Sequence, residues 1–158
     1  MSVPFFARSN GDWIRATPAL DGDTLYVAGM RDVLVALNST DGSERWRLDF
    51  VKRFGADLPT FGFVSSPLID GDSVYVQAGG GVARLRKADG QVVWHGARDG
   101  GGMMGSAFGS PVILTLAGKR LRFSGNNVYF NQADIVYGRI AAVEESLDKM
   151  AALGMTVA

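Results

Sequence analysis

The sequence contains two copies of one segment, and a repeat of this kind constrains the fold more than any other feature. Residues 16–29, ATPALDGDTLYVAG, match residues 65–78, SSPLIDGDSVYVQA, at a spacing of 49 residues. Residues 36–46, ALNSTDGSERW, match residues 84–94, RLRKADGQVVW, at a spacing of 48 residues. Any fold proposed for the chain therefore has to be built from a unit of about 48 residues.

Each copy is predicted to form four short antiparallel strands joined by tight turns. Asp-Gly pairs occur at 21–22 and 41–42 in the first copy and at 70–71 and 89–90 in the second. Such pairs are strong hairpin signals because Gly accepts a positive φ. The segments between them are rich in aromatic and β-branched residues, and residues 43–50 and 91–97 are the expected fourth strands.

Four strands in about 48 residues are typical of a β-propeller blade. A jelly roll or an immunoglobulin-type sandwich has similar strands but gives no reason for a repeat at this spacing. A third copy begins at residues 109–123, GSPVILTLAGKRLRF, and does not continue to a third Trp. We therefore predict an all-β fold of four-stranded antiparallel propeller-type blades, about 2.5 repeats long, with a C-terminal α-helix.

The predicted organisation assigns every part of the chain to a blade, a connection or the helix. The segments are an N-terminal segment like an inter-blade connection (1–14), a first blade (15–51), a connection (52–64), a second blade (65–97), a glycine-rich connection (98–108), a partial third blade (109–131) and an amphipathic helix (132–154). Because a closed propeller needs four to eight blades, we expect the chain to be a fragment of a larger propeller.

The C-terminal helix is predicted from a change of periodicity. Apolar residues recur at spacings of four and three from Val136 to Met150, while acidic residues fall between them. The simplest interpretation is an amphipathic helix that lies on a sheet and shields an open strand edge. A helix for self-association and a disordered segment are the alternatives.

Charge and cysteine content exclude several classes of function. The chain has 16 Lys and Arg against 16 Asp and Glu, so its net charge gives no electrostatic case for binding nucleic acid. No apolar run approaches the roughly 18 residues needed for membrane insertion. The absence of Cys excludes disulfides and thiolate chemistry. The N-terminal residues do not show the pattern of a signal peptide, and the location is therefore unknown from the sequence.

No catalytic residue and no metal site is predicted. His95 is the single histidine, and strand alternation after an inward Trp94 is expected to point it outward. One His cannot form a His cluster, and the Asp-Gly-Asp turns lack the further oxygens of a calcium loop.

A glycine-rich stretch at 98–110 is the remaining candidate site. It lacks the Lys of a phosphate-binding P-loop, so an inter-blade connection is the preferred interpretation. A ligand-contacting loop at the propeller mouth is the alternative. The cofactor-binding candidates in that case are Gly101, Gly102, Met103, Met104 and Ser106.

One motif in each copy resembles the tryptophan-docking motif of the PQQ-like (quinoprotein) β-propeller repeat family, Ala-x-Asp-x-x-x-Gly-x-x-x-Trp. The first copy has Asn where Asp is usual, and the second has Arg at the Ala and Asp positions. The motif residues are Ala36, Asn38, Gly42, Trp46, Gly90 and Trp94. The resemblance, which covers about residues 15–123, implies that each Trp packs between adjacent blades and that the Gly permits the turn on which it packs.

The resemblance implies a non-enzymatic scaffold or protein-interaction module, similar to the outer-membrane assembly lipoproteins. It implies a protein partner or self-association, no cofactor, and a periplasmic, envelope or secreted location for the full-length protein. The alternative is part of a PQQ-dependent quinoprotein dehydrogenase, with PQQ and Ca²⁺ on the propeller axis. That class adds an adjacent Cys pair, which this chain lacks. A truncated fragment without independent function is the third interpretation.

Overall fold

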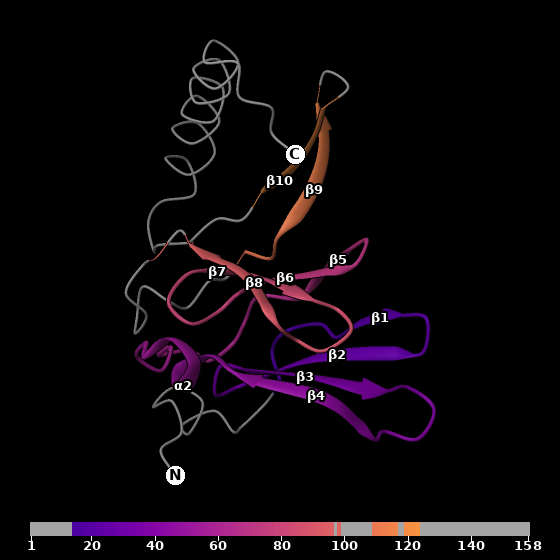
Figure 1. Cartoon of the computed structure of the whole chain (residues 1–158). Coiled ribbons are helices and arrows are strands. Elements are labelled where there is room, and N and C mark those ends of the chain that lie inside the picture. Colours follow the sequence, from indigo (N-terminus) through magenta and orange to yellow (C-terminus); the bar gives the residue numbers. More distant parts are fainter. Residues whose placement is uncertain (1–13, 97, 99–108, 117–118, 124–158) are drawn as a thin grey trace. The chain divides into compact units, whose positions relative to one another are not determined.

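A computed structural model describes residues 14–96, 98, 109–116 and 119–123 of the 158-residue chain (Figure 1). These residues form two four-stranded antiparallel sheets, one two-stranded sheet and one short helix. Both four-stranded sheets lie in one of the two compact units into which the chain divides, and most of the two-stranded sheet lies in the other. None of the helices described is long and apolar enough to cross a membrane.

The first four-stranded sheet follows the chain from one edge to the other. Its strands are β1 (Ala19–Asp21), β2 (Thr24–Gly29), β3 (Val33–Asn38) and β4 (Glu44–Asp49), in that order. The turns that join β1 to β2 and β3 to β4 contain Gly22 and Gly42, with φ of 57° and 73°. Both turns are those predicted from the Asp-Gly pairs.

The second four-stranded sheet repeats the first in order and in detail. Its strands are β5 (Leu68–Asp70), β6 (Ser73–Gln77), β7 (Val82–Arg86) and β8 (Val92–Gly96). The register shifts between Ala36 and Leu37 in β3 and between Arg84 and Leu85 in β7, which are equivalent positions. The predicted fold of four-stranded antiparallel blades is therefore confirmed, and we call these sheets blade 1 and blade 2.

The third copy provides a two-stranded antiparallel sheet of β9 (Val112–Leu116) and β10 (Lys119–Phe123). It corresponds to the start of the predicted partial blade. The predicted C-terminal helix at 132–154 lies outside the described residues.

A short helix between the blades was missing from the sequence prediction. β4 ends at Asp49 instead of continuing through Phe50, and helix α2 (Phe50–Phe54) follows directly. The Asp49 side chain caps the helix by accepting a hydrogen bond from the Lys52 backbone N–H at 2.9 Å. Gly55, in the left-handed conformation, ends it.

Blades 1 and 2 share one hydrophobic core. Phe50 of α2 is fully buried within it, and its ring packs edge to face against that of Phe63, with the ring centroids 6.1 Å apart. The other large buried members come from both sheets, namely Tyr26, Leu34 and Trp46 from blade 1 and Val74, Val76 and Leu85 from blade 2. Helix α2 and the loop after it therefore complete a core that neither sheet forms alone.

Asp32 joins three elements at the edge of this core. Its side chain is in the turn between β2 and β3, is 2% exposed, and accepts a hydrogen bond from the Gly79 backbone N–H at 2.6 Å. Its carbonyl oxygen accepts a hydrogen bond from the backbone N–H of Phe50 at 3.0 Å. Asp32 has a φ of 61°, a left-handed conformation that Asp tolerates better than most side chains do.

We predict that Asp32→Ala lowers the free energy of unfolding by about 2 kcal/mol or more, because a buried donor at Gly79 loses a charged acceptor. Asp32→Asn keeps an acceptor and should lose less. The measurement is equilibrium denaturation in urea, with Asp72→Ala as the control at an exposed turn position. Equal losses for Asp32→Ala and the control would contradict the assignment.

Candidate functional site

The junction between the two blades is centred on Trp46 of β4. The side chain is 8% exposed, and its Nε1–H donates a hydrogen bond to the Lys87 carbonyl oxygen of blade 2 at 2.8 Å. The indole lies directly against Gly90, where an added Cβ would be 2.5 Å from the Trp46 Cε3 atom. The Tyr26 ring packs beside it, with a centroid separation of 5.8 Å.

The turn that receives Trp46 needs glycine for two reasons. Gly90 has a φ of 69°, which L side chains rarely adopt, and its backbone N–H donates a hydrogen bond to the Arg86 carbonyl oxygen at 3.0 Å. The indole also occupies the space that any side chain at this position would need. Backbone conformation and packing therefore select the same residue.

Blade 1 contains the same turn. Gly42 has a φ of 73°, and its backbone N–H donates a hydrogen bond to the Asn38 carbonyl oxygen at 2.8 Å. The Asn38 side-chain oxygen accepts a further bond from the Thr40 backbone N–H at 3.0 Å. In contrast to Gly90, a Cβ added at Gly42 would meet nothing within 4 Å.

The expected orientations of Trp94 and His95 were wrong. Trp94 is 49% exposed, so it does not point inward. His95 is not directed outward, because its ring stacks on that of Phe54 with the centroids 3.7 Å apart. The two neighbouring side chains still alternate, but the covered face was assigned wrongly. Helix α2, which the sequence analysis missed, places the Phe54 ring on the face of β8 that was expected to point outward.

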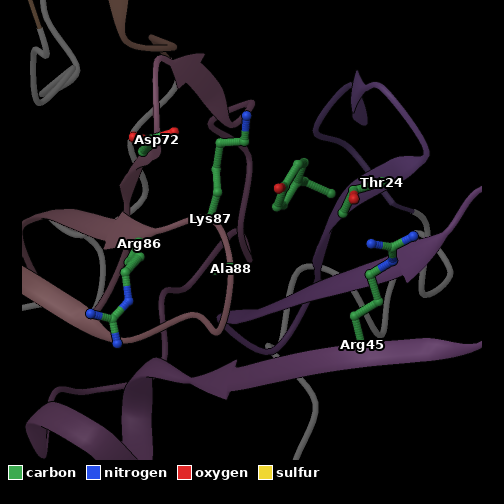
Figure 2. Close-up of a pocket in the computed structure, with 7 residues that line it drawn as sticks. Thr24, Arg45, Asp72, Arg86, Lys87 and Ala88 are labelled. Carbon is green, nitrogen blue, oxygen red and sulfur yellow. The ribbon is translucent and has the colours of Figure 1, made fainter.

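A pocket of about 370 Å³ opens where the two blades meet, and it is lined in part by Tyr26. Figure 2 shows Thr24 and Arg45 on one side and the turn of blade 2 on the other. The lining residues are Thr24, Tyr26 and Arg45 from blade 1 and Asp72, Arg86, Lys87 and Ala88 from blade 2.

The three cationic side chains of the pocket each have a carboxylate partner. Arg45 pairs with Asp23 at 2.6 Å within blade 1. Arg86 pairs with Asp89 within the turn of blade 2. Lys87 pairs with Asp21 across the junction, which adds an ion pair to the contact made by its carbonyl oxygen.

These contacts shift the pKa values of the paired groups in the directions that strengthen the pairs. The hydrogen bond from Arg45 lowers the pKa of Asp23, and that from Arg86 lowers the pKa of Asp89. The hydrogen bond to Asp21 raises the pKa of Lys87. Burial raises the pKa of the Tyr26 hydroxyl, which keeps it neutral at physiological pH.

The donor set of this pocket does not fit Ca²⁺ or a Ca²⁺-bound quinone. Calcium takes six to eight oxygen ligands, and Asp72 is the one carboxylate in the lining. Across the part of the chain that the structure describes, no three His, Cys, Asp or Glu side chains gather in a way that could hold a metal. The loop candidates Gly101, Gly102, Met103, Met104 and Ser106 lie outside that part.

Comparison with known proteins identifies the family. A family model described as "Outer membrane protein assembly factor BamB" matches residues 6–146. The chain belongs to this family of PQQ-like repeats. No curated protein matches the sequence.

Solved structures similar to this chain include members of two functional groups. BamB from Moraxella catarrhalis is 25% identical, with a TM-score of 0.43, over 54% of this chain and 24% of its own. Quinohemoprotein alcohol dehydrogenase from Comamonas testosteroni is 25% identical, with a TM-score of 0.48, over 68% of this chain and 16% of its own. This chain thus spans about a quarter or less of the length of the structures it matches.

The sequence analysis named the residues of the Trp46 contact but missed the pocket. Lys87 and Asp21 are far apart in sequence, and the residue equivalent to Lys87 in blade 1 is Ser39, so the repeat gives no sign of an ion pair. Arg86 was noticed as a departure from the family motif and was otherwise expected to be a solvated charge on a strand, with anion binding as the alternative. The sequence does not show that the β1–β2 turn, which holds Asp21, lies beside the β7–β8 turn, which holds Lys87.

We predict that Gly90→Ala destabilises the fold more than Gly42→Ala. Both substitutions force Ala into a left-handed conformation, at a cost of about 1 kcal/mol, but only Gly90→Ala also collides with an indole. Overpacking adds about 1–3 kcal/mol. Urea denaturation of dilute protein measures the difference, which should disappear in a Trp46→Leu background. A difference that persists there would contradict a contact between Trp46 and Gly90.

Acid should weaken the fold in part through Asp23 and Asp89. Their folded pKa values lie below the unfolded value of 3.8, so their stabilisation is present above about pH 4 and is lost as the pH falls through the folded values. We expect the melting temperature of the double variant Asp23→Asn/Asp89→Asn to fall less than that of the natural sequence when the pH is lowered from about 5 to about 2.5. This range brackets the pH of about 4 below which the stabilisation is lost. Salt at about 1 M should reduce the difference. Parallel pH profiles in low salt would refute the prediction.

Proposed function

We propose that this chain is a non-enzymatic module of a BamB-like propeller and acts as a scaffold for protein assembly. The observation that carries the proposal is that the polar groups of the junction are bonded to other groups of the same chain. Arg45, Arg86 and Lys87 are all paired with carboxylates of the same chain, and the Trp46 indole N–H is bonded to a backbone carbonyl. These polar groups are therefore engaged within the chain, and Lys87 and Trp46 use theirs to join the two blades.

Membership of the family supports the same function, because the family is described by an assembly factor of the outer membrane. The proposed organisation keeps the first blade at 15–51 and the second at 65–97, joined by the connection at 52–64. It also includes a protein partner and a place in the cell envelope for the whole protein.

Exposed apolar side chains give the proposed scaffold a surface for protein contacts. Five large apolar residues in the described part of the chain are more than two-fifths exposed, namely Ile14, Leu20, Val93, Trp94 and Val112. Aromatic residues such as Trp94 are enriched at protein interfaces relative to the rest of the surface. A scaffold that binds proteins accounts for these positions better than a site for a small substrate does.

We predict that the chain does not bind PQQ in the presence of Ca²⁺. Isothermal titration calorimetry on the full chain should give no saturable heat with or without Ca²⁺, because the described junction lacks a calcium ligand set. Saturable binding that depends on Ca²⁺ would overturn the scaffold proposal in favour of a quinoprotein dehydrogenase.

A positive test uses a photo-crosslinking amino acid at Leu20, which is 63% exposed in blade 1. In cells that export the chain, we expect a discrete crosslink to an envelope protein that takes part in outer-membrane assembly. The matched control is the same amino acid at Lys52, whose side chain is 84% exposed on α2. Identical crosslinks at both positions would show non-specific contact and would contradict the proposal.

A further inference from the structure

We propose that the pocket between the blades binds the guanidinium of an arginine side chain from a partner protein, with the Asp72 carboxylate as its principal acceptor. The inference rests on the proposed scaffold function and deepens it, because it names the chemistry by which a partner is recognised. Three features of the pocket support it, namely an unpaired carboxylate, two buried hydroxyl groups and a volume that suits one side chain.

Asp72 is the carboxylate of the pocket that lacks a cationic partner. The ion pairs formed among the described residues do not include it. Lys87 attracts Asp72 at longer range, but its ammonium group is paired with Asp21. The backbone of Asp72 is fixed, because its carbonyl oxygen accepts a hydrogen bond from the Lys87 N–H at 2.9 Å, while the residue itself is exposed. The pocket therefore presents one carboxylate at a defined position and open to a ligand.

The repeat explains why Asp72 has no partner. In blade 1 the equivalent carboxylate, Asp23, pairs with Arg45 at 2.6 Å. In blade 2 the position of Arg45 is occupied by Val93, at the spacing of 48 residues. Val93 is 55% exposed and has no charge, so it cannot neutralise Asp72. An incoming arginine would form from outside the pair that blade 1 forms internally.

The charges around the pocket favour a cation over an anion. Each of its three cationic side chains is already paired with a carboxylate of the same chain. With Asp72 included, four carboxylates face three cations, and the set has a net charge of minus one. An anion would have to displace a carboxylate from one of the pairs, whereas a cation meets Asp72 without breaking any of them. Charge complementarity therefore selects a ligand with a single positive charge.

Two buried hydroxyl groups favour a guanidinium over an ammonium group. Thr24 and Tyr26 line the same pocket and are 8% and 1% exposed. A hydroxyl oxygen accepts hydrogen bonds, and a guanidinium presents more N–H donors than an ammonium does, in a planar fork. One edge of the fork can donate to both oxygens of a carboxylate while another N–H donates to a hydroxyl. The polar groups of the pocket thus match arginine better than lysine.

The size of the pocket suits one side chain. Its volume of about 370 Å³ is near the lower end of the range for ligand sites, roughly 300 to 1,000 Å³. Ala88 provides an apolar part of the wall for the methylene groups of an arginine. An ion pair with an exposed carboxylate contributes little alone. The arginine therefore acts as one anchor of a larger protein contact, a role in which arginine is enriched.

The test is an NMR titration of the full chain with N-acetyl-arginine amide. The backbone amide signals of Thr24, Asp72 and Ala88 should shift saturably, with a dissociation constant of about 1 mM, as expected for a ligand of this size. N-acetyl-citrulline amide has nearly the same shape without the charge and should give no saturable shift. Inorganic phosphate, which tests the pocket as an anion site, should give none either.

Two variants remove the free carboxylate in different ways. Asp72→Asn keeps the shape of the side chain and should raise the dissociation constant at least about 10-fold, because a charged acceptor is lost. Val93→Arg supplies an internal partner for Asp72 at an exposed position and should weaken binding by a similar factor. Asp57→Asn is the matched control, because it removes an exposed carboxylate outside the pocket and should leave binding unchanged. Dispersed amide signals show that each variant is folded.

Four results would overturn the proposal. These are no saturable shift with the arginine probe, equal binding of the citrulline probe, binding of phosphate in place of arginine, and unchanged affinity in folded Asp72→Asn. None of them affects the scaffold function, which depends on the PQQ titration and on the crosslink at Leu20. Failure of the two proposals can thus be told apart.

Discussion

The contact of Trp46 with Gly90 is the interaction on which the rest of the structure depends. The indole closes the face of blade 1 over Tyr26 and Ala36, and it binds the turn of blade 2 through both its ring and its N–H. Without a second blade, this row of the first sheet would be exposed to water. A single blade of this chain therefore has no complete core, as expected for repeats that bury their apolar faces on their neighbours.

The repeat predicted the strands and the turns because these depend on local chemistry. Asp-Gly pairs at 41–42 and 89–90 fix hairpins without help from distant residues. The elements that the sequence did not reveal depend on the junction instead. Helix α2 is only five residues long, and its Phe50 is explained by a core shared with blade 2. The orientation of His95 follows from its contact with α2. Alternation along one strand shows which residues share a face, but it does not show which face is covered.

The ion pairs at the junction contribute less to stability than the packing of Trp46 and its neighbours does. Arg45–Asp23 and Arg86–Asp89 lie within one blade and are exposed, and pairs of this kind contribute little on average. Lys87–Asp21 differs because it connects the blades, and its Lys side chain is 26% exposed. The pair adds specificity to the junction, since Ser39 at the equivalent position of blade 1 cannot form it. The second blade is thus matched to the first by charge as well as by shape.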